Sequence, residues 1–218
     1  KKIQATFGSS GLDVVSVSTG FMRRNRDAVT LTFDESFRTD MFGSLENIKK
    51  IWYKNSLSAT LSYGETSTTA SCTAIESGYL QMYGLKLDYG NYFTVTDNVQ
   101  GTQKIILGSE IAEALFPNGD AVGKQIVLVS NKVPFGFEVT GVLKEQSSGM
   151  ESSTTGAYIP RGLYEKKITP NPSADTMMVQ AVSTDKATAL VTAIENYCKE
   201  KSGTEYSVNV MSMQTMIE

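Results

Sequence analysis

The first part of the chain alternates between segments with the apolar spacing of strands and one with the spacing of a helix. Residues 12–18 are rich in β-branched side chains and alternate in part, which predicts a strand. Residues 32–43 carry apolar side chains on one face, and Thr32 and Glu35 have capping-box spacing. We therefore expect a short helix that Gly43 ends.

A hairpin is predicted next. Residues 48–61 and 66–75 are rich in aromatic, β-branched and hydroxyl side chains, a composition that favours strands. Gly64 lies between them, and glycine is a common turn residue because it adopts positive φ angles without strain. The two segments are therefore expected to pair as antiparallel strands.

The middle of the chain is predicted to be a small β-rich subdomain. Glycines punctuate it at about ten-residue intervals, at Gly84, Gly90, Gly101, Gly108, Gly123, Gly136 and Gly141. Strands are predicted at 103–107, 124–129 and 135–143. Ser109 is expected to cap a short helix over residues 111–116.

The last part of the chain repeats the strand–helix–strand pattern of the first. Residues 176–182 predict a strand, and residues 185–201 have the clearest helical spacing in the sequence, with Gly203 placed to end the helix. Residues 205–211 predict a closing strand. Each outer part thus supplies a helix flanked by strands, so we expect the two parts to share one sheet around an inserted middle.

Composition excludes several function classes. The 218 residues include 20 Lys and Arg, 23 Asp and Glu and no histidine, which gives a formal net charge of −3. The absence of histidine removes the commonest general base and a common zinc ligand. The acidic balance gives no basic footprint for nucleic acid. No apolar run approaches the roughly 20 residues of a membrane-spanning helix. Most classes of enzyme are therefore disfavoured.

Two short motifs resemble known signatures, and both are better interpreted as structural. Residues 119–125 have three residues between their glycines, where a phosphate-binding P-loop has four, and no Ser or Thr follows the lysine. Residues 183–186 have the SxxK spacing of acylating serine enzymes. The same residues suit a helix start with Ser183 or Thr184 as its cap. A turn and a helix cap are the expected roles.

The remaining charged and sulfur-containing residues also favour structural roles. Acids lie close in sequence as Asp34 with Glu35, Glu110 with Glu113, and Glu195 with Glu200. Such pairs usually lie on solvated faces, whereas a glycosidase needs two acids in a cleft. The basic cluster at 23–26 is expected to decorate a loop, with binding of an acidic partner as the alternative. Cys72 and Cys198 lack metal-site spacing, which leaves a disulfide and two separate core thiols both open.

The two ends of the chain and one long polar segment do not fit the pattern of helices and strands. Residues 144–156 are polar and without period, which indicates a functional or a mobile loop. The chain begins without methionine at Lys1 and ends at Glu218, two residues after the methionine-rich run 211–216, with no glycine or polar tail to close the pattern. We interpret both ends as cuts in a longer protein, with a processed secreted protein as the alternative at the start. The methionine run is expected on one side of a helix that packs against a partner helix.

Five stretches in the middle of the chain carry a family resemblance. They read, in order, YLQMYGLKLDYGNYFT at 79–94, IILGSEIAEALFP at 105–117, AVGKQI at 121–126, FEVTGVL at 137–143 and AYIP at 157–160. Their combination over roughly residues 75–160 resembles MacB-type permeases of ABC transporters, while the outer parts match in pattern and length only. Asn91 is a departure, because the family often has arginine after the glycine.

The resemblance implies an α+β fold and the extracytoplasmic domain of a MacB/FtsX-like ABC transporter permease. Residues 1–82 and 158–218 would form a porter-like α/β subdomain, with residues 83–157 as an inserted β-rich, Sabre-like subdomain. The domain itself would be non-catalytic, with no catalytic, cofactor-binding or metal-binding residues. A cytoplasmic ATPase would hydrolyse ATP, and membrane helices would transmit the movement. Such systems export peptides, drugs or lipoproteins, sense peptides or control cell-wall enzymes, and the resemblance does not choose among these.

The resemblance also implies partners. These are the protein's own membrane helices, the ATPase, a second permease subunit of the same or another kind, and a membrane-fusion protein or other extracytoplasmic partner, with no nucleic acid. The polar loop becomes the candidate contact surface, because exposed loops on a rigid scaffold commonly carry binding. The expected contact residues are Gln146, Ser147, Ser148, Met150 and Glu151. Deletion of residues 146–155 is expected to impair transport and to leave the fold intact.

Two alternatives from other classes remain. The first is a stand-alone secreted or surface-anchored binding module, whose full gene would show a signal peptide and no later membrane helices. The second is a metal-free hydrolase that uses carboxylates or a serine, which would need a deep cleft lined by acids.

Overall fold

The protein has an α+β fold built from two compact units. The computed structural model describes residues 11–19, 31–147, 150–170, 173–204 and 208–212. We call the described residues of 11–54 and 173–212 the split unit, because it is made of two chain segments, and residues 55–170 the continuous unit. The chain leaves the split unit within a strand, between Lys54 and Asn55.

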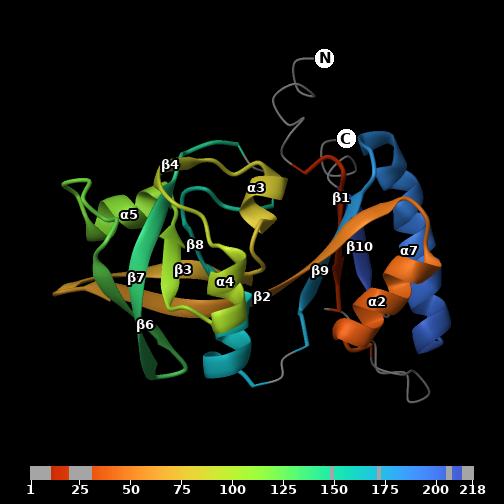
Figure 1. Ribbon diagram of the computed structural model, residues 1–218, viewed down its shortest axis with the longest axis horizontal. Helices are drawn as coiled ribbons and strands as arrows, with labels where there is room; N and C mark the ends of the chain where they lie inside the picture. The colour runs from red at the N-terminus through yellow and green to blue at the C-terminus, as the bar shows by residue number, and fades with distance from the viewer. Residues whose placement is uncertain (1–10, 20–30, 148–149, 171–172, 205–207, 213–218) are drawn as a thin grey trace. The chain divides into compact units, whose positions relative to one another are not determined.

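The split unit is a four-stranded antiparallel sheet with two helices (Figure 1). Its elements are β1 (Val14–Ser18), α2 (Glu35–Ser44), the first part of β2 (Ile48–Tyr63), β9 (Thr176–Ala181), α7 (Ala187–Ser202) and β10 (Asn209–Ser212). The strand order is β10–β1–β9–β2, and each neighbouring pair is antiparallel. The two outer parts of the sequence therefore do share one sheet, as expected, and the continuous unit is inserted between β2 and its partner β9.

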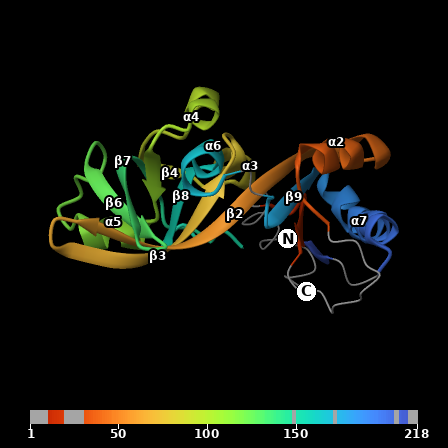
Figure 2. The ribbon, with the colours of Figure 1, turned by 90° about the horizontal axis from the view of Figure 1, so that it is seen from below.

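One face of this sheet is apolar and is covered by both helices. Figure 2 shows α2 and α7 next to each other beside β9. Alternate side chains of the strands form one wall of the core. The apolar side chains that recur every 3.6 residues along α7 form the other wall. The buried residues of this core include Val15, Val17, Met41, Ile51, Tyr53, Met177, Val179, Leu190, Ile194 and Cys198. Burial of these side chains, more than local propensity, holds α2 and α7 in place.

The helix boundaries in the split unit differ from expectation at three of four ends. The N-cap of α2 is Asp34, whose Oδ1 accepts the Phe37 N–H at 2.9 Å, and not Thr32. Gly43 lies inside this helix, which ends at Ser44. A 3₁₀ turn, Thr184–Lys186, precedes α7, and no side chain caps this helix. Gly203 ends α7 with a φ of 78°, which confirms the fourth prediction.

The continuous unit contains the predicted hairpin and the predicted β-rich middle. Its elements are the rest of β2, β3 (Thr66–Ile75), α3 (Tyr79–Tyr83), β4 (Leu87–Gly90), α4 (Val95–Gln100), β5 (Lys104–Leu107), α5 (Ser109–Leu115), β6 (Gln125–Ser130), β7 (Val133–Leu143), β8 (Gly156–Pro160), α6 (Arg161–Leu163) and a π-helical turn, Tyr164–Ile168. The short elements α3, β4, α4, β8, α6 and the π-helical turn were not among the elements that the residue pattern predicts.

Six strands of this unit close on themselves. The order β2–β3–β8–β5–β7 continues through β6, which pairs with both β7 and β2, and β4 joins at β7. The pairs β3–β8 and β5–β7 are parallel, so the sheet is mixed. Inward-facing side chains and α5 fill the enclosed space, among them Leu61, Cys72, Ile105, Ile111, Leu115, Leu128, Phe137, Val139 and Ile159. Closure removes free strand edges from this part of the sheet.

The continuous unit is longer than the insert expected over residues 83–157, because segments on both sides of that range pack with it. The β2–β3 hairpin precedes that range, yet it is needed to complete the ring of strands. After it, Gly162 of α6 lies against α4 and donates its N–H to Asn98 Oδ1 at 2.8 Å. The segment limits expected at 82/83 and 157/158 therefore fall inside this unit.

Candidate functional site

The expected contact loop, residues 144–156, is tied to the body of the continuous unit. Gln146 accepts the Lys86 N–H at 3.0 Å through Oε1 and donates through Nε2 to the Gly84 carbonyl at 2.8 Å. Ser153 is buried, and its hydroxyl donates to the Gln146 carbonyl at 2.9 Å. Gln146 thus uses its amide inside the protein, and the loop is anchored at this end.

Glu151 lies in a pocket of tyrosines and is only 4% exposed. The hydroxyl of Tyr79 donates to Glu151 Oε1 at 2.6 Å. The Met150 N–H donates to the hydroxyl of Tyr83 at 3.1 Å, and the hydroxyl of Tyr158 donates to the Ser152 carbonyl at 2.8 Å. We call Tyr79, Tyr83 and Tyr158 the tyrosine cluster. Its three hydroxyls bond the loop at Met150, Glu151 and Ser152.

The electrostatics of this cluster favour protonated tyrosines. Burial raises the pKa of Tyr79 well above the ordinary value of 10, and the nearby charge of Glu151 raises it further. Burial is also the main reason that the pKa values of Tyr83 and Tyr158 are raised. The three hydroxyls therefore remain hydrogen-bond donors or acceptors over the accessible pH range, and none is placed to act as a base.

The other expected contact residues have different environments. Ser147 is exposed and Met150 is half-buried. Ser148 lies outside the described residues, as does the basic cluster at 23–26 and most of the methionine run at 211–216. Met211 itself belongs to strand β10, so a helix does not begin there. Among the described members of these five residues, Ser147 is thus the exposed one.

The first turn of α5 also depends on this loop. The Gly108 N–H donates to the Gly156 carbonyl at 2.8 Å, and the Ser109 and Glu110 N–H groups each donate at 2.9 Å to carbonyls of the loop. The expectation that Ser109 caps this helix is therefore wrong, since its side-chain oxygen is buried and Gly108 is the N-cap. A deletion of residues 146–155 would remove the Ser153 and Thr154 carbonyls, which accept the Ser109 and Glu110 N–H groups, together with Glu151. We therefore now expect this deletion to destabilise the fold.

The motifs considered from the sequence occupy structural positions. Residues 119–125 form the turn between α5 and β6, where Gly119 and Gly123 have φ angles of 80° and 91°. The hydroxyl of Ser183 donates to Asp185 within the helix start. The close pairs of acids on α5 and α7 are exposed, as expected: Glu110, Glu113, Glu195 and Glu200.

Neither cysteine is available for chemistry. Cys72 and Cys198 are free thiols and lie in different units, which resolves the open choice in favour of two core thiols. Burial raises the pKa of each to about 12, so both remain protonated. Within the described ranges, no group of three or more His, Cys, Asp or Glu side chains is arranged to hold a metal ion.

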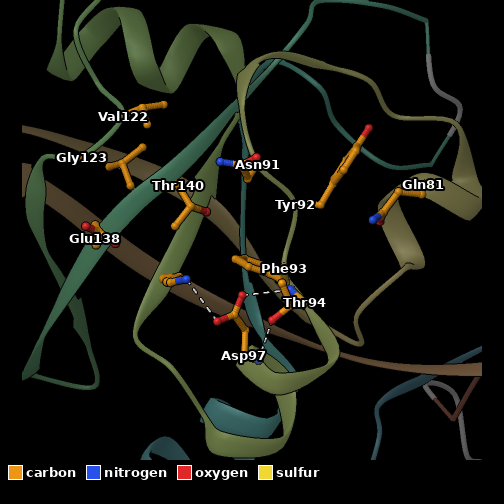
Figure 3. A pocket seen from close by; sticks show the side chains of 12 residues that line it. Gln81, Asn91, Tyr92, Phe93, Thr94, Asp97, Val122, Gly123, Glu138 and Thr140 are labelled. Carbon is orange, nitrogen blue, oxygen red and sulfur yellow. Dashed lines mark hydrogen bonds and ion pairs between the residues drawn. The ribbon is translucent and has the colours of Figure 1, made fainter.

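A pocket of about 580 Å³ lies on the outside of the strand ring in the continuous unit (Figure 3). Its lining comes from α3, the segment after β4, α4, β5, the turn before β6, and β7. The lining residues are Gln81, Asn91, Tyr92, Phe93, Thr94, Asp97, Lys104, Val122, Gly123, Glu138, Val139 and Thr140. Sequence reasoning missed this site, because its residues come from six separate segments and form no motif.

Asp97 is held in the pocket wall by Thr94 and Lys104. Thr94 and Asp97 form a true capping box, with the Thr94 N–H bonded to Asp97 Oδ2 at 2.9 Å and the Asp97 N–H to Thr94 Oγ1 at 3.0 Å. Lys104 Nζ lies 3.2 Å from Asp97 Oδ1. Burial by itself raises the pKa of Asp97, but the hydrogen bonds from Thr94 and Lys104 outweigh it, and the pKa is lowered. Asp97 is therefore ionised and paired.

Backbone hydrogen bonds to β7 hold the pocket walls. The Asn91 N–H donates to the Thr140 carbonyl and the Gly123 N–H to the Val139 carbonyl, both at 2.8 Å. Gly90, with a φ of 96°, makes the first of these possible, since a Cβ there would lie 2.2 Å from the same Thr140 oxygen. The walls of the pocket are thus held by the protein's own backbone.

No helix within the described ranges is both long and apolar enough to cross a membrane.

Solved structures match the fold along most of the chain. The periplasmic region of MacB from Actinobacillus actinomycetemcomitans matches 100% of this chain and 96% of that chain, with a TM-score of 0.72 and 23% identity. The extracellular domain of the noncanonic ABC-type transporter YknZ from Gram-positive bacteria matches 91% of this chain and 99% of that chain, with a TM-score of 0.68 and 22% identity. These likenesses show the shared fold.

Sequence comparison gives the same group of proteins. The uncharacterized ABC transporter permease YknZ of Bacillus subtilis is 25% identical over 187 residues, which cover 86% of this chain and 46% of that protein. The macrolide export ATP-binding/permease protein MacB of Neisseria gonorrhoeae is 25% identical over 224 residues, 100% of this chain and 34% of that protein. The chain thus spans between about a third and a half of the length of these relatives. The family model of the MacB-like periplasmic core domain matches residues 1–197, and the chain belongs to that family.

Proposed function

We propose that this chain is the extracytoplasmic domain of an ABC transporter permease and that it is a non-catalytic relay, coupling ATP hydrolysis on the cytoplasmic side to work outside the membrane. The match of the family model to residues 1–197 carries this proposal. The shared fold over 100% of the chain with the periplasmic region of MacB supports it. The partners would be the protein's own membrane helices, a cytoplasmic ATPase, a second permease subunit and a membrane-fusion protein or other extracytoplasmic partner.

The chemistry of the described residues supports a relay in preference to an enzyme. The candidate nucleophiles Cys72 and Cys198 are buried with pKa values raised to about 12. The close pairs of acids face solvent and do not meet in a cleft. The long strand β2 hydrogen-bonds with β9 through residues 48–54 and with β6 through residues 60–62. A displacement applied to one unit would therefore be passed on through continuous backbone.

The location is tested with a cysteine placed at Ser147 in the full-length protein in its own cells. Ser147 is exposed, and the two native thiols are buried, so background labelling should be low. We expect a membrane-impermeant maleimide to label Ser147→Cys without lysis, after permeabilisation of any outer membrane. Ser153→Cys, at a position 2% exposed, is the matched control and should remain unlabelled. Labelling of Ser147→Cys only after lysis would refute the extracytoplasmic location.

The same cells distinguish the alternative of a stand-alone binding module. The proposed permease should fractionate with the cytoplasmic membrane and copurify with an ATPase after crosslinking. Recovery of the full-length protein from the medium, or from the cell surface without an ATPase, would favour the binding module instead.

The relay is tested by separating ATP hydrolysis from export in the reconstituted transporter. A macrolide antibiotic is the first substrate to try, because one relative is named for macrolide export. If the loop contacts a partner, Ser147→Arg should reduce export while ATP hydrolysis and stability of the domain are retained. Ser67→Arg, at an exposed serine of β3, is the control and should leave export unchanged. Equal effects of both substitutions, or loss of ATP hydrolysis with export, would contradict a contact at this loop.

A further inference from the structure

The pocket beside β7 has a lining that the proposed relay does not use. Its volume of about 580 Å³ is within the range of roughly 300–1,000 Å³ usual for small-molecule sites. Its walls combine aromatic rings, side-chain amides and charged groups, a mixture suited to fixing the orientation of a polar ligand. All the lining residues belong to the continuous unit, so the site is complete within it.

The charges in the pocket leave one carboxylate uncompensated. Lys104 is the single cation of the lining, and its Nζ lies 3.2 Å from Asp97 Oδ1. Lys104 is also the register partner of Glu138 on the parallel neighbour β7, but its ammonium group pairs with Asp97 and makes no ion pair with Glu138. Glu138 is half-exposed and has no ion pair with any residue that the structure describes. The pocket therefore has a formal charge of −1 and attracts a cation.

Aromatic rings and free amides complete the lining. Phe93 is 5% exposed, and Tyr92 is fixed because its hydroxyl donates to the Leu85 carbonyl at 2.6 Å. Rings of this kind attract ammonium and guanidinium groups and pack against aliphatic stems. In the view of Figure 3 the Tyr92 ring lies between Asn91 and Gln81. Their side-chain amides have no hydrogen bond to a described residue and match the donors and acceptors of a peptide group.

One further polar group of the lining lacks a protein partner. The hydroxyl oxygen of Thr140 is buried without a hydrogen bond to the described residues. Buried hydroxyls are normally satisfied, so such a group beside a preformed pocket is consistent with a polar ligand or its bound water. The pocket walls themselves are fixed by backbone bonds from Asn91 and Gly123 to β7, so little ordering is required on binding.

We propose that this pocket binds the side chain of a lysine or arginine residue in a short peptide segment. The cationic head lies at Glu138, the aliphatic stem runs along Tyr92 and Phe93, and Asn91 and Gln81 bond the adjacent peptide groups. Free alkylamines also carry a cationic head on an aliphatic stem. Only a peptide has the peptide groups that Asn91 and Gln81 would bond, so these two contacts distinguish a peptide from an alkylamine. This site is independent of the coupling role, and its absence would leave that role unaffected.

The test measures the binding of three capped amino acids to the 218-residue chain. Titration monitored by NMR or calorimetry gives the affinity of each probe. The probes are the N-acetyl methylamides of lysine, norleucine and glutamate, which differ mainly in charge at nearly constant length. We expect the lysine probe to bind about tenfold more tightly than the norleucine probe, since a hydrogen bond to a charged group is usually worth that much. Equal affinity for lysine and norleucine, or preference for glutamate, would overturn the proposal.

Two variants locate the site and its source. Glu138→Gln should weaken the lysine probe by about tenfold, whereas Glu113→Gln, at an exposed acid of α5 outside the lining, should not. Asn91→Ala should weaken the lysine probe but leave butylamine unchanged, because butylamine has no peptide group. Thermal unfolding of each variant checks that the fold is retained. An unchanged affinity in Glu138→Gln would show that the cation binds elsewhere, and an equal loss of butylamine in Asn91→Ala would show an alkylamine site.

Discussion

The hydroxyl of Tyr79 donates a 2.6 Å hydrogen bond to the buried carboxylate of Glu151, 72 residues further along the chain. This bond joins α3 to the loop after β7 and replaces water around a charged group that is only 4% exposed. Burial of a carboxylate is costly unless hydrogen bonds compensate for lost hydration. The loop that looked free in the sequence is therefore an integral part of the continuous unit.

Replacement of Tyr79 by phenylalanine should measure this contribution. Tyr79→Phe keeps the ring but removes the donor to Glu151, so we expect the free energy of unfolding to fall by about 1–3 kcal/mol. Urea unfolding at neutral pH gives the value. Tyr63→Phe is the control, because Tyr63 is 39% exposed, and it should change stability by no more than about 0.5 kcal/mol. Similar losses in both variants would contradict a special role of the Tyr79–Glu151 bond.

The long elements could be predicted from the sequence because their side-chain periodicity extends over several turns or pleats. The helix predicted at 185–201 and the strand predicted at 176–182 agree with α7 and β9 within two residues at each end. Both present one apolar face to the same core, so local pattern and tertiary packing agree. The short helices α3 and α4, of five and six residues, do not extend far enough to show a period.

The sites could not be predicted because they depend on contacts between distant segments. Glu151 occurs among serines and threonines, a composition typical of an exposed loop, and nothing near it in sequence signals the tyrosine cluster. The pocket likewise gathers residues from Gln81 to Thr140 through the pairing of β5 with β7. One signal was present: Thr94 and Asp97 have capping spacing, and Asp97 lines the pocket.

Two glycine-to-alanine substitutions should change stability in opposite directions. A Cβ on Gly162 would lie 1.6 Å from the Asn98 carbonyl oxygen, so α4 and α6 would have to separate, and we expect a loss of at least about 1–3 kcal/mol. Gly43 lies inside α2, and no neighbouring side chain or loop comes within 4 Å of the place that an added methyl group would take, so Gly43→Ala should stabilise by about 0.5–1 kcal/mol. Thermal unfolding compares the two. Destabilisation by Gly43→Ala would show that α2 is not a regular helix at this residue.

The two thiols should react only when the protein unfolds. Cys72 and Cys198 are 1% and 0% exposed, and burial raises the pKa of each to about 12. At pH 8 a thiol reagent such as dithionitrobenzoate should therefore release almost no chromophore from the native chain. In concentrated guanidinium chloride it should titrate both cysteines without prior reduction, since neither forms a disulfide. One fast equivalent in the native state would contradict burial, and a need for reductant would contradict free thiols.

The pH dependence of stability should report the paired state of Asp97. Its pKa in the folded protein is lowered below the ordinary value of 3.8, because the hydrogen bonds from Thr94 and Lys104 outweigh the effect of burial. As the pH falls, the unfolded chain therefore binds a proton at this residue before the folded chain does. The stabilisation from Asp97 should be fully present above about pH 5 and decline as the pH falls through the lowered pKa.

Comparison of the wild-type chain with Asp97→Asn isolates this contribution, because the other titrating groups are common to both. We expect Asp97→Asn to be less stable at pH 7, with a difference that narrows steadily below about pH 4. Urea unfolding at a series of pH values from 7 to about 2.5 provides the measurement. Lys104→Met removes a neighbouring cation that lowers the pKa of Asp97. The acid-induced loss of stability should therefore begin at a higher pH in this variant. A difference between wild type and Asp97→Asn that stays constant down to the lowest pH would show that the carboxylate does not depend on its charge in the folded protein.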